Sequence, residues 1–193
     1  KSLGLTSKVR PSISSEGIIY VSGYAINAET GDVMWNNGLT GNEISIGPGN
    51  LIILNTADSM VAVDKESGNP LWAFDQAFEL AGPVISEQQI VYFAGRYTNS
   101  DNVTINNIYA VDYLTGVKLW EYNLGARFYS APIIGQNGDI YCAIDGKLVV
   151  LNASGVFSWE ISGYYSYPII TAAGDLVGGS LSSANIETRT ENW

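Results

Sequence analysis

Residues 109–120 read Tyr-Ala-Val-Asp-Tyr-Leu-Thr-Gly-Val-Lys-Leu-Trp, and this phrase decides the fold because the chain repeats it. Residues 24–35 and 61–72 carry the same pattern, and residues 149–159 carry a copy that is one residue shorter. In each copy a glycine stands four positions before a tryptophan, after a serine or threonine, and an Asp or Asn closes the preceding apolar run. The repeated pairs are Gly31 with Trp35, Gly68 with Trp72, Gly116 with Trp120, and Gly155 with Trp159.

Each position of the phrase has a physical reason. A short apolar strand must reverse into the strand that carries the tryptophan, and an Asp or Asn side chain can bond the backbone of that turn. Glycine supplies the positive φ that a tight hairpin needs. The phrase therefore predicts a β-hairpin.

Two further strands are expected ahead of each hairpin. Apolar runs form such pairs at residues 11–13 and 18–21, 83–85 and 90–93, and 132–134 and 139–142, while residues 51–54 form a run after Pro48. Four strands in roughly 40 residues, without helical periodicity, predict the four-stranded antiparallel blades of a β-propeller, the architecture that WD40 repeats also use. We name the strands of a blade A to D from the hub outwards.

A fifth copy of the repeat is degraded. Residues 168–171 and 175–177 repeat the first two strands, and Asn185 and Thr188 stand eight and five residues before Trp193. Arg189 replaces the glycine, so this turn is expected to have another geometry. The sequence predicts four complete blades and a fifth that is incomplete or is closed by residues 1–7. The single domain, residues 1–193, is then either a closed five-bladed ring or a fragment of a larger propeller.

The phrase Ala-x-Asp-x-x-Thr-Gly-x-x-x-Trp, complete at residues 110–120, resembles the PQQ-like repeat of the quinoprotein alcohol dehydrogenase superfamily. The resemblance covers nearly the whole chain. It implies a propeller in which the tryptophans dock each blade against its neighbour. Many members carry no quinone, including lipoproteins of outer-membrane assembly, surface proteins and sensor domains. The resemblance therefore implies a periplasmic, cell-surface or secreted location, but it is weak evidence for an activity.

Composition excludes several function classes. Nine Lys and Arg residues stand against 19 Asp and Glu residues, so the net charge is −10 and nucleic acid is not an expected partner. The longest aliphatic run, residues 51–54, is too short for a transmembrane segment. The chain has no histidine and only one cysteine, Cys142, which removes Ser-His-Asp and Cys-His catalysis and intrachain disulfides.

The residues required for quinoprotein dehydrogenase or glycosidase activity are also missing or otherwise explained. Quinoprotein dehydrogenases, so far as the resemblance goes, use a vicinal cysteine pair, a calcium ion and an aspartate base, and Cys142 alone cannot form the pair. It lies in a strand-like run, where a buried, inert thiol is expected. Asp64 with Glu66 or Glu16 is a conceivable glycosidase pair, but a turn explains Asp64 and solvent explains the glutamates. We expect no catalytic residues and no bound cofactor.

The polar stretch at residues 97–107 is the remaining candidate for a metal. It could hold calcium through Asp101 and amide oxygens, but it supplies one carboxylate and does not have the spacing of an EF-hand loop. A solvated insertion is the simpler interpretation. We expect no metal site.

The expected function is a non-catalytic scaffold that binds a protein or polysaccharide partner through its loops. Strand reversals place the D-to-A and B-to-C connections on one face, here called the connection face, and the A-to-B and C-to-D turns on the other, the turn face. Aromatic and arginine side chains, frequent at binding hot spots, gather in the connections. The candidate partner-binding residues are Tyr97, Asp101, Arg127, Phe128, Tyr129, Tyr164, Tyr165 and Tyr167.

Three alternatives stay open at this point. The chain could belong to a larger propeller enzyme of the quinoprotein type whose active site lies in other blades. It could present a carbohydrate-binding surface through exposed tyrosines. The tyrosines could also merely cap the blades or line the central channel.

Overall fold

A computed structural model describes residues 9–163, 167–171, 175–178, 182–185 and 190–191. These residues form 20 β-strands in five four-stranded sheets, and every strand pair is antiparallel and follows chain order. The predicted all-β propeller architecture is confirmed. Within the described ranges there is no helix that is long and apolar enough to cross a membrane.

Each sheet is one blade, with its strands in the order A to D. Blade 1 consists of β1 (Ser12–Ile13), β2 (Ile18–Val21), β3 (Tyr24–Asn27) and β4 (Val33–Asn36). Blade 2 consists of β5 (Gly41–Ile46), β6 (Leu51–Thr56), β7 (Met60–Asp64) and β8 (Pro70–Phe74). Blade 3 consists of β9 (Phe78–Ile85), β10 (Ile90–Thr98), β11 (Thr104–Asp112) and β12 (Lys118–Asn123).

The last two blades begin, like blade 1, with an inner strand of only two residues. Blade 4 consists of β13 (Ile133–Ile134), β14 (Ile140–Ile144), β15 (Lys147–Leu151) and β16 (Phe157–Ser162). Blade 5 consists of β17 (Ile169–Ile170), β18 (Asp175–Gly178), β19 (Ser182–Asn185) and β20 (Thr190–Glu191). Because β20 supplies a fourth strand, the expectation of an incomplete fifth blade is wrong. The proposed closure by residues 1–7, the Arg189 turn and Trp193 lie outside the described residues.

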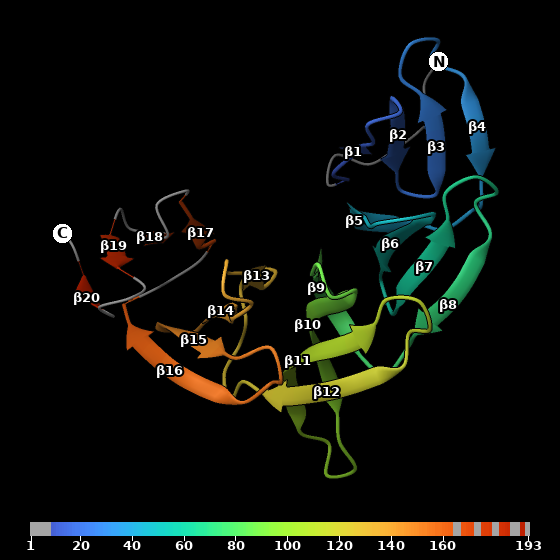
Figure 1. The fold of residues 1–193 in the computed structure, drawn as a ribbon. Coiled ribbons are helices and arrows are strands. Elements are labelled where there is room, and N and C mark those ends of the chain that lie inside the picture. The colour runs from blue at the N-terminus through green and yellow to red at the C-terminus, as the bar shows by residue number, and fades with distance from the viewer. Residues whose placement is uncertain (1–8, 164–166, 172–174, 179–181, 186–189, 192–193) are drawn as a thin grey trace.

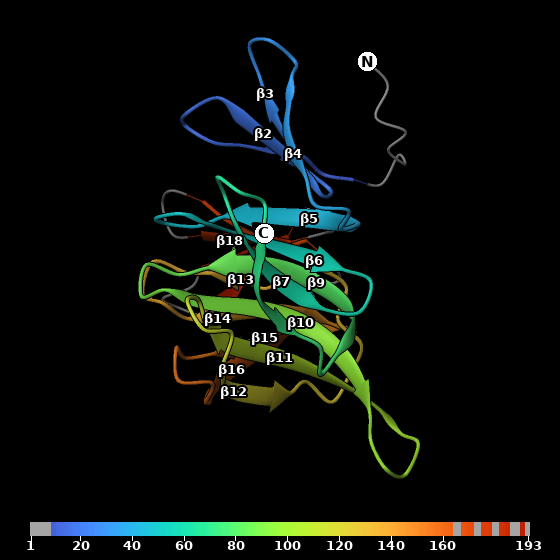
Figure 2. The same cartoon turned by 90° about the vertical axis from the view of Figure 1, so that its right-hand side faces the viewer.

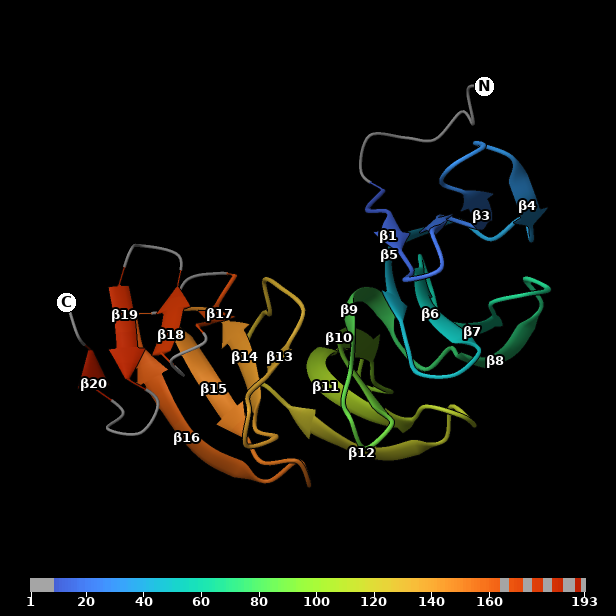
Figure 3. The ribbon, with the colours of Figure 1, turned by 45° about the horizontal axis from the view of Figure 1, so that its top comes forward.

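The blades follow one another along an open arc, with the A strands on its inner side and the D strands on its outer side (Figure 1). The described strands of blades 1 and 5 lie at opposite ends of this arc (Figure 3). The arc, rather than a closed five-bladed ring, is therefore the form that the described residues take.

Apolar side chains of the middle strands fill the space between neighbouring blades. Along β10, Val91 and Phe93 point into the cluster shared with blade 2, whereas Tyr92 and Ala94 point into the cluster shared with blade 4. Successive side chains of a strand point to opposite faces of a sheet, so a blade between two others must be apolar on both. This explains why the B and C strands are continuous hydrophobic runs.

The repeated tryptophans join each blade to the next. The indole nitrogens of Trp35, Trp72 and Trp120 donate hydrogen bonds of 2.9, 2.9 and 3.1 Å to carbonyls of the following C-to-D turns. Each indole also covers the glycine of that turn. These tryptophans thus contact the neighbouring blade, as the resemblance implies, and all three are half-buried.

The turn itself has the predicted chemistry. The Asp64 carboxylate accepts hydrogen bonds from the backbone N–H groups of Ser67 and Glu66, at 2.7 and 3.1 Å, and from the Ser67 hydroxyl at 2.7 Å. Gly68 then adopts a φ of +75°. The bond from the Ser67 backbone is the largest cause of a lowered pKa at Asp64, because it favours the charged form.

Candidate functional site

A hollow of about 710 Å³ lies at the hub, where the A strands begin on the connection face. All five blades contribute to its wall. Its lining residues are Val9, Arg10, Asn42, Glu43, Asn55, Leu80, Ala81, Tyr129, Ser130, Ala131, Ile133, Tyr167, Pro168 and Ile169. We call this feature the hub hollow.

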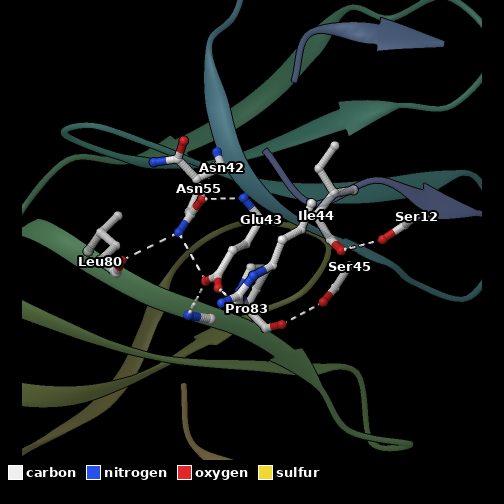
Figure 4. A network of polar contacts seen from close by, with 10 residues as sticks. Ser12, Asn42, Glu43, Ile44, Ser45, Asn55, Leu80 and Pro83 are labelled. Atoms are coloured by element: carbon white, nitrogen blue, oxygen red, sulfur yellow. Dashed lines mark hydrogen bonds and ion pairs between the residues drawn. The ribbon is translucent and has the colours of Figure 1, made fainter. Parts of the chain in front are cut away.

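One wall of the hub hollow is a polar seam centred on Glu43 of β5 (Figure 4). Its Oε1 accepts a 2.5 Å hydrogen bond from Arg10, and its Oε2 accepts bonds from the Gly82 backbone at 3.1 Å and from Asn55 Nδ2 at 3.4 Å. These partners come from blades 1, 3 and 2. A single carboxylate therefore ties three blades together.

The Asn55 side chain completes this seam from the neighbouring strand β6. It is only 4% exposed, and its Oδ1 accepts hydrogen bonds from the backbone N–H groups of Glu43 at 2.8 Å and Asn42 at 3.3 Å. Its Nδ2 also donates to the Leu80 carbonyl at 3.4 Å. These bonds fix the start of β5, where the register with β6 is irregular between Gly41 and Glu43.

Two serine hydroxyls extend the seam toward the turn face. Ser12 donates to the Ile44 carbonyl at 2.8 Å, and Ser45 donates to the Pro83 carbonyl at 2.5 Å. Each bond crosses from one A strand to the A strand of the next blade. The inner strands of the first three blades are thus linked by side chains rather than by a shared sheet.

The opposite wall of the hub hollow is apolar and aromatic. Tyr129 and Tyr167 precede the A strands of blades 4 and 5 and are 42% and 66% exposed. Ile133 also lines the hub hollow. The Tyr129 hydroxyl donates to Asp145 at 3.2 Å, which holds this ring at the rim. The hollow thus offers apolar contact on one side and a fixed ion pair on the other.

The structure brings some predicted site residues together and separates others. Tyr129 and Tyr167 both line the hub hollow, whereas Arg127 is exposed beside it on the connection before blade 4. Phe128 is only 8% exposed and packs in the core between blades 3 and 4, so it offers no surface to a partner. Tyr164 and Tyr165 lie outside the described residues.

The polar insertion at residues 97–107 is an extended hairpin rather than a loop. The strands β10 and β11 pair as far as Thr98 with Thr104, so Tyr97 is a half-buried strand residue and Asp101 stands at the exposed tip. The hairpin projects beyond the other blades (Figure 2). Polar and apolar residues alternate in this stretch at Thr104, Ile105 and Asn106. This alternation is a strand signal, but the polar composition of the stretch concealed it.

Arg96 braces the base of this hairpin. Its guanidinium forms an ion pair with Glu79, donates to Asn106 Oδ1 at 3.1 Å, and lies 5.5 Å from the centroid of the Phe128 ring. A guanidinium over an aromatic face is favourable electrostatically. The hairpin is therefore anchored to the connection that also carries Tyr129.

Burial raises the pKa values of several side chains in the core. Burial raises the pKa of Tyr109, Tyr113 and Tyr141 to about 12, and it raises the pKa of the Cys142 thiol well above its ordinary value. Cys142 is 2% exposed, as the sequence predicted for an inert thiol. Within the described ranges, no group of three or more Cys, Asp or Glu side chains is placed to hold a metal ion.

The residues of the hub hollow do not fit the calcium-bound quinone that the resemblance to quinoprotein dehydrogenases implies. Glu43 is the one carboxylate among its described lining residues, and Arg10, Asn55 and Gly82 already occupy its oxygens. Cys142 packs in the core between blades 3 and 4 and is not among the residues that line the hub hollow.

Repeated four-stranded blades, joined by tryptophans that cover the turns of the next blade, define a β-propeller of PQQ-like repeats. The chain belongs to the family described as outer membrane protein assembly factor BamB, whose model matches residues 4–151. No curated protein matches the sequence significantly.

Solved structures share the fold at low sequence identity. The chain is similar to the Dos1 propeller, with a TM-score of 0.73 and 10% identity, over 94% of this chain and 57% of that one. It is similar to quinohemoprotein alcohol dehydrogenase from Comamonas testosteroni, with a TM-score of 0.68 and 14% identity, over 92% of this chain and 39% of that one.

A third similar structure is a protein of unknown function from Bacteroides caccae, with a TM-score of 0.61 and 13% identity, over 95% of this chain and 70% of that one. The chain thus spans 39% to 70% of the length of these three structures. At these identities the likeness concerns the fold alone.

Proposed function

We propose that this chain is a non-catalytic binding module that holds a protein partner at the connection face, with the hub hollow at the centre of the contact. The observation that carries the proposal is the asymmetry of the hollow. Exposed Tyr129 and Tyr167 form one wall, and the Arg10–Glu43 ion pair forms the other.

Such a wall suits recognition because tyrosine supplies a large, stiff contact area and a polar hydroxyl at low entropic cost. In the neighbouring polar seam the Glu43 carboxylate and the Asn55 amide already have hydrogen-bond partners, so a partner can cover these two groups without leaving them unpaired. A hollow of about 710 Å³ admits one or two large side chains of a docking segment.

The family supports a protein partner and an extracytoplasmic location. The family is described as an outer membrane protein assembly factor, a role that involves other proteins. We propose that the partner of this chain is likewise a protein and that the two meet outside the cytoplasm. The formal charge of −10 favours a partner whose contact surface is not strongly acidic.

Site-specific photo-cross-linking tests this proposal in cells that make the protein. A photoreactive phenylalanine at position 129 or 167 is expected to cross-link to the same partner, whereas the same residue at position 66 on the turn face is not. Glu66 is the matched control because it is also exposed and lies in a short connection. Cross-links that arise only from position 66 would overturn the proposal.

A further inference from the structure

The β10–β11 hairpin is much longer than the B-to-C connections of the neighbouring blades. In blades 1, 2 and 4 these connections are short turns, between residues 21 and 24, 56 and 60, and 144 and 147. In blade 3 both strands continue past the rest of the sheet, as Figure 2 shows, and residues 97–105 pair only with one another. We call residues 97–105 the arm. Because blades 2 and 4 flank blade 3 on both sides, the exposure of the arm is a property of this blade itself.

The two faces of the arm differ in polarity. Tyr97 is paired with Ile105, and Val103 lies two residues before Ile105, so these three side chains share one face. Thr98 and Thr104, which are also paired, lie on the other face. The arm therefore has one mainly apolar face and one polar face. We call Tyr97, Val103 and Ile105 the arm face.

The arm face continues the surface by which blade 3 packs against blade 2. Phe93 and Tyr109 are paired on the same side of the two strands, and both are buried in the cluster shared with blade 2. Further along this side the cover decreases: Tyr97 and Ile105 are half-buried, and Val103 is 53% exposed. Apolar side chains that gather on one face outside the core favour an interaction site.

The surroundings of the arm face are acidic. Asp58 lies in the B-to-C turn of blade 2, two residues before Met60, and Asp75 directly follows Phe74. Met60 and Phe74 pack in the same cluster as the strands beneath the arm. Asp101 stands at the tip of the arm itself. All three aspartates are exposed, and none forms an ion pair with another described residue. The arm face therefore combines apolar contact with unpaired negative charge nearby.

We propose that the arm face binds a basic segment of a protein, in which apolar side chains stand beside Lys or Arg residues. The apolar side chains of this segment cover Tyr97, Val103 and Ile105, and its cations pair with the exposed aspartates. Opposite charges steer the encounter and disfavour an acidic partner. None of the arm residues lines the hub hollow, so this proposal does not rest on the function proposed for the hollow.

Fluorescence anisotropy with labelled synthetic peptides tests this proposal on the full chain. The probe is a short, soluble peptide in which Val and Lys residues alternate, and it is expected to bind. Two control peptides of the same length replace either every Val with Ser or every Lys with Glu, and each is expected to bind more weakly by roughly tenfold or more. A probe that does not bind overturns the proposal. So does equal binding of the probe and the Ser control, because charge alone would then attract the peptide.

A matched pair of valine variants tests whether the probe binds at the arm. Val103→Ser removes apolar contact near the tip and is expected to weaken binding roughly fivefold. Val156→Ser is the control, since Val156 is 59% exposed, against 53% for Val103, but lies in the C-to-D turn of blade 4 on the turn face. Both variants are expected to keep the wild-type melting temperature. Equal affinities in the two variants would contradict binding at the arm face.

A matched pair of charge variants tests the role of the aspartates. Asp58→Asn with Asp75→Asn is expected to weaken binding of the probe roughly fivefold at low ionic strength, and the difference is expected to shrink as salt is added. Glu29→Gln with Glu66→Gln changes the net charge by the same amount on the turn face and is expected to leave the affinity nearly unchanged. Equal losses in both double variants would mean that only the net charge of −10 attracts the peptide, and the proposed site would be wrong.

Discussion

The inner strands of blades 1 and 2 differ sharply from those of blades 3 and 4. At equivalent hub positions, blades 1 and 2 carry Ser12 and Ser45, whose hydroxyls bond the next blade, whereas blades 3 and 4 carry Val84 and Ile133. At the matching positions the B and C strands show no such contrast, because packing between the blades requires apolar side chains there. The hub wall is the part of the fold where these blades differ from one another, and binding specificity can therefore reside there.

The largest effect on stability is expected at Asn55, the buried residue of the polar seam. Asn55→Ala removes the acceptor of two backbone N–H groups and a donor to Glu43, and it is expected to lower the free energy of unfolding by about 2–4 kcal/mol. Urea denaturation followed by fluorescence measures this change. Ala131→Ser, just before the inner strand of blade 4, is the control and is expected to cost less than about 1 kcal/mol. Equal losses would mean that the seam does not hold the first three blades together.

An exchange of the equivalent residues sharpens the comparison at a smaller scale. Ser45→Val abolishes the hydrogen bond to the Pro83 carbonyl and is expected to cost about 1 kcal/mol. Val84→Ser has no equivalent carbonyl bond to gain among the described contacts, and is expected to lose part of its apolar burial instead. If the variant with both exchanges had the wild-type melting temperature, the two positions would be interchangeable. The difference between serine in blade 2 and valine in blade 3 would then make no contribution to stability.

The smallest effect concerns the C-to-D turns, which divide the four blades into different pairs. Asp64 and Asp112 cap the turns of blades 2 and 3, whereas Asn27 and Asn152 take this position in blades 1 and 4. Turn hydrogen bonds lower the pKa of both aspartates, led by the Ser67 backbone at Asp64 and the Thr115 hydroxyl at Asp112.

A lowered folded-state pKa gives stability that is present above the unfolded pKa and is lost as pH falls through the folded pKa. We expect the double variant Asp64→Asn, Asp112→Asn to lose less stability than wild type between neutral pH and about pH 3. Because both carboxylates are exposed, solvent screening keeps the difference small. Urea midpoints at the two pH values give the comparison, and parallel losses in both proteins would contradict it.

The sequence predicted the blades well because their signal is local. The Asp or Asn, the glycine and the tryptophan of one hairpin lie within nine residues, and each has a fixed role. The strand β5 was missed because its residues Asn42, Glu43 and Ser45 break the apolar pattern for the sake of the seam. The length of the β10–β11 hairpin was missed because polar side chains suit strands that project into solvent.

The polar seam could not be predicted from local patterns. Arg10 and Glu43 are 33 residues apart and belong to different blades, so only the curvature of the arc brings them together. The tyrosines were found because aromatic residues in connections stand out in the sequence. Their arrangement around one hollow, opposite an ion pair, is a property of the folded arc.

The most direct test of the central claim compares the two faces against the partner identified by cross-linking. Tyr129→Ser with Tyr167→Ser is expected to weaken binding of that partner by roughly tenfold or more, with the melting temperature nearly unchanged, since the two residues are 42% and 66% exposed. Glu29→Ser with Glu66→Ser on the turn face is expected to leave the affinity unaltered. Full affinity in the tyrosine variant, together with loss of binding in the glutamate variant, would contradict the assignment of the connection face as the binding surface.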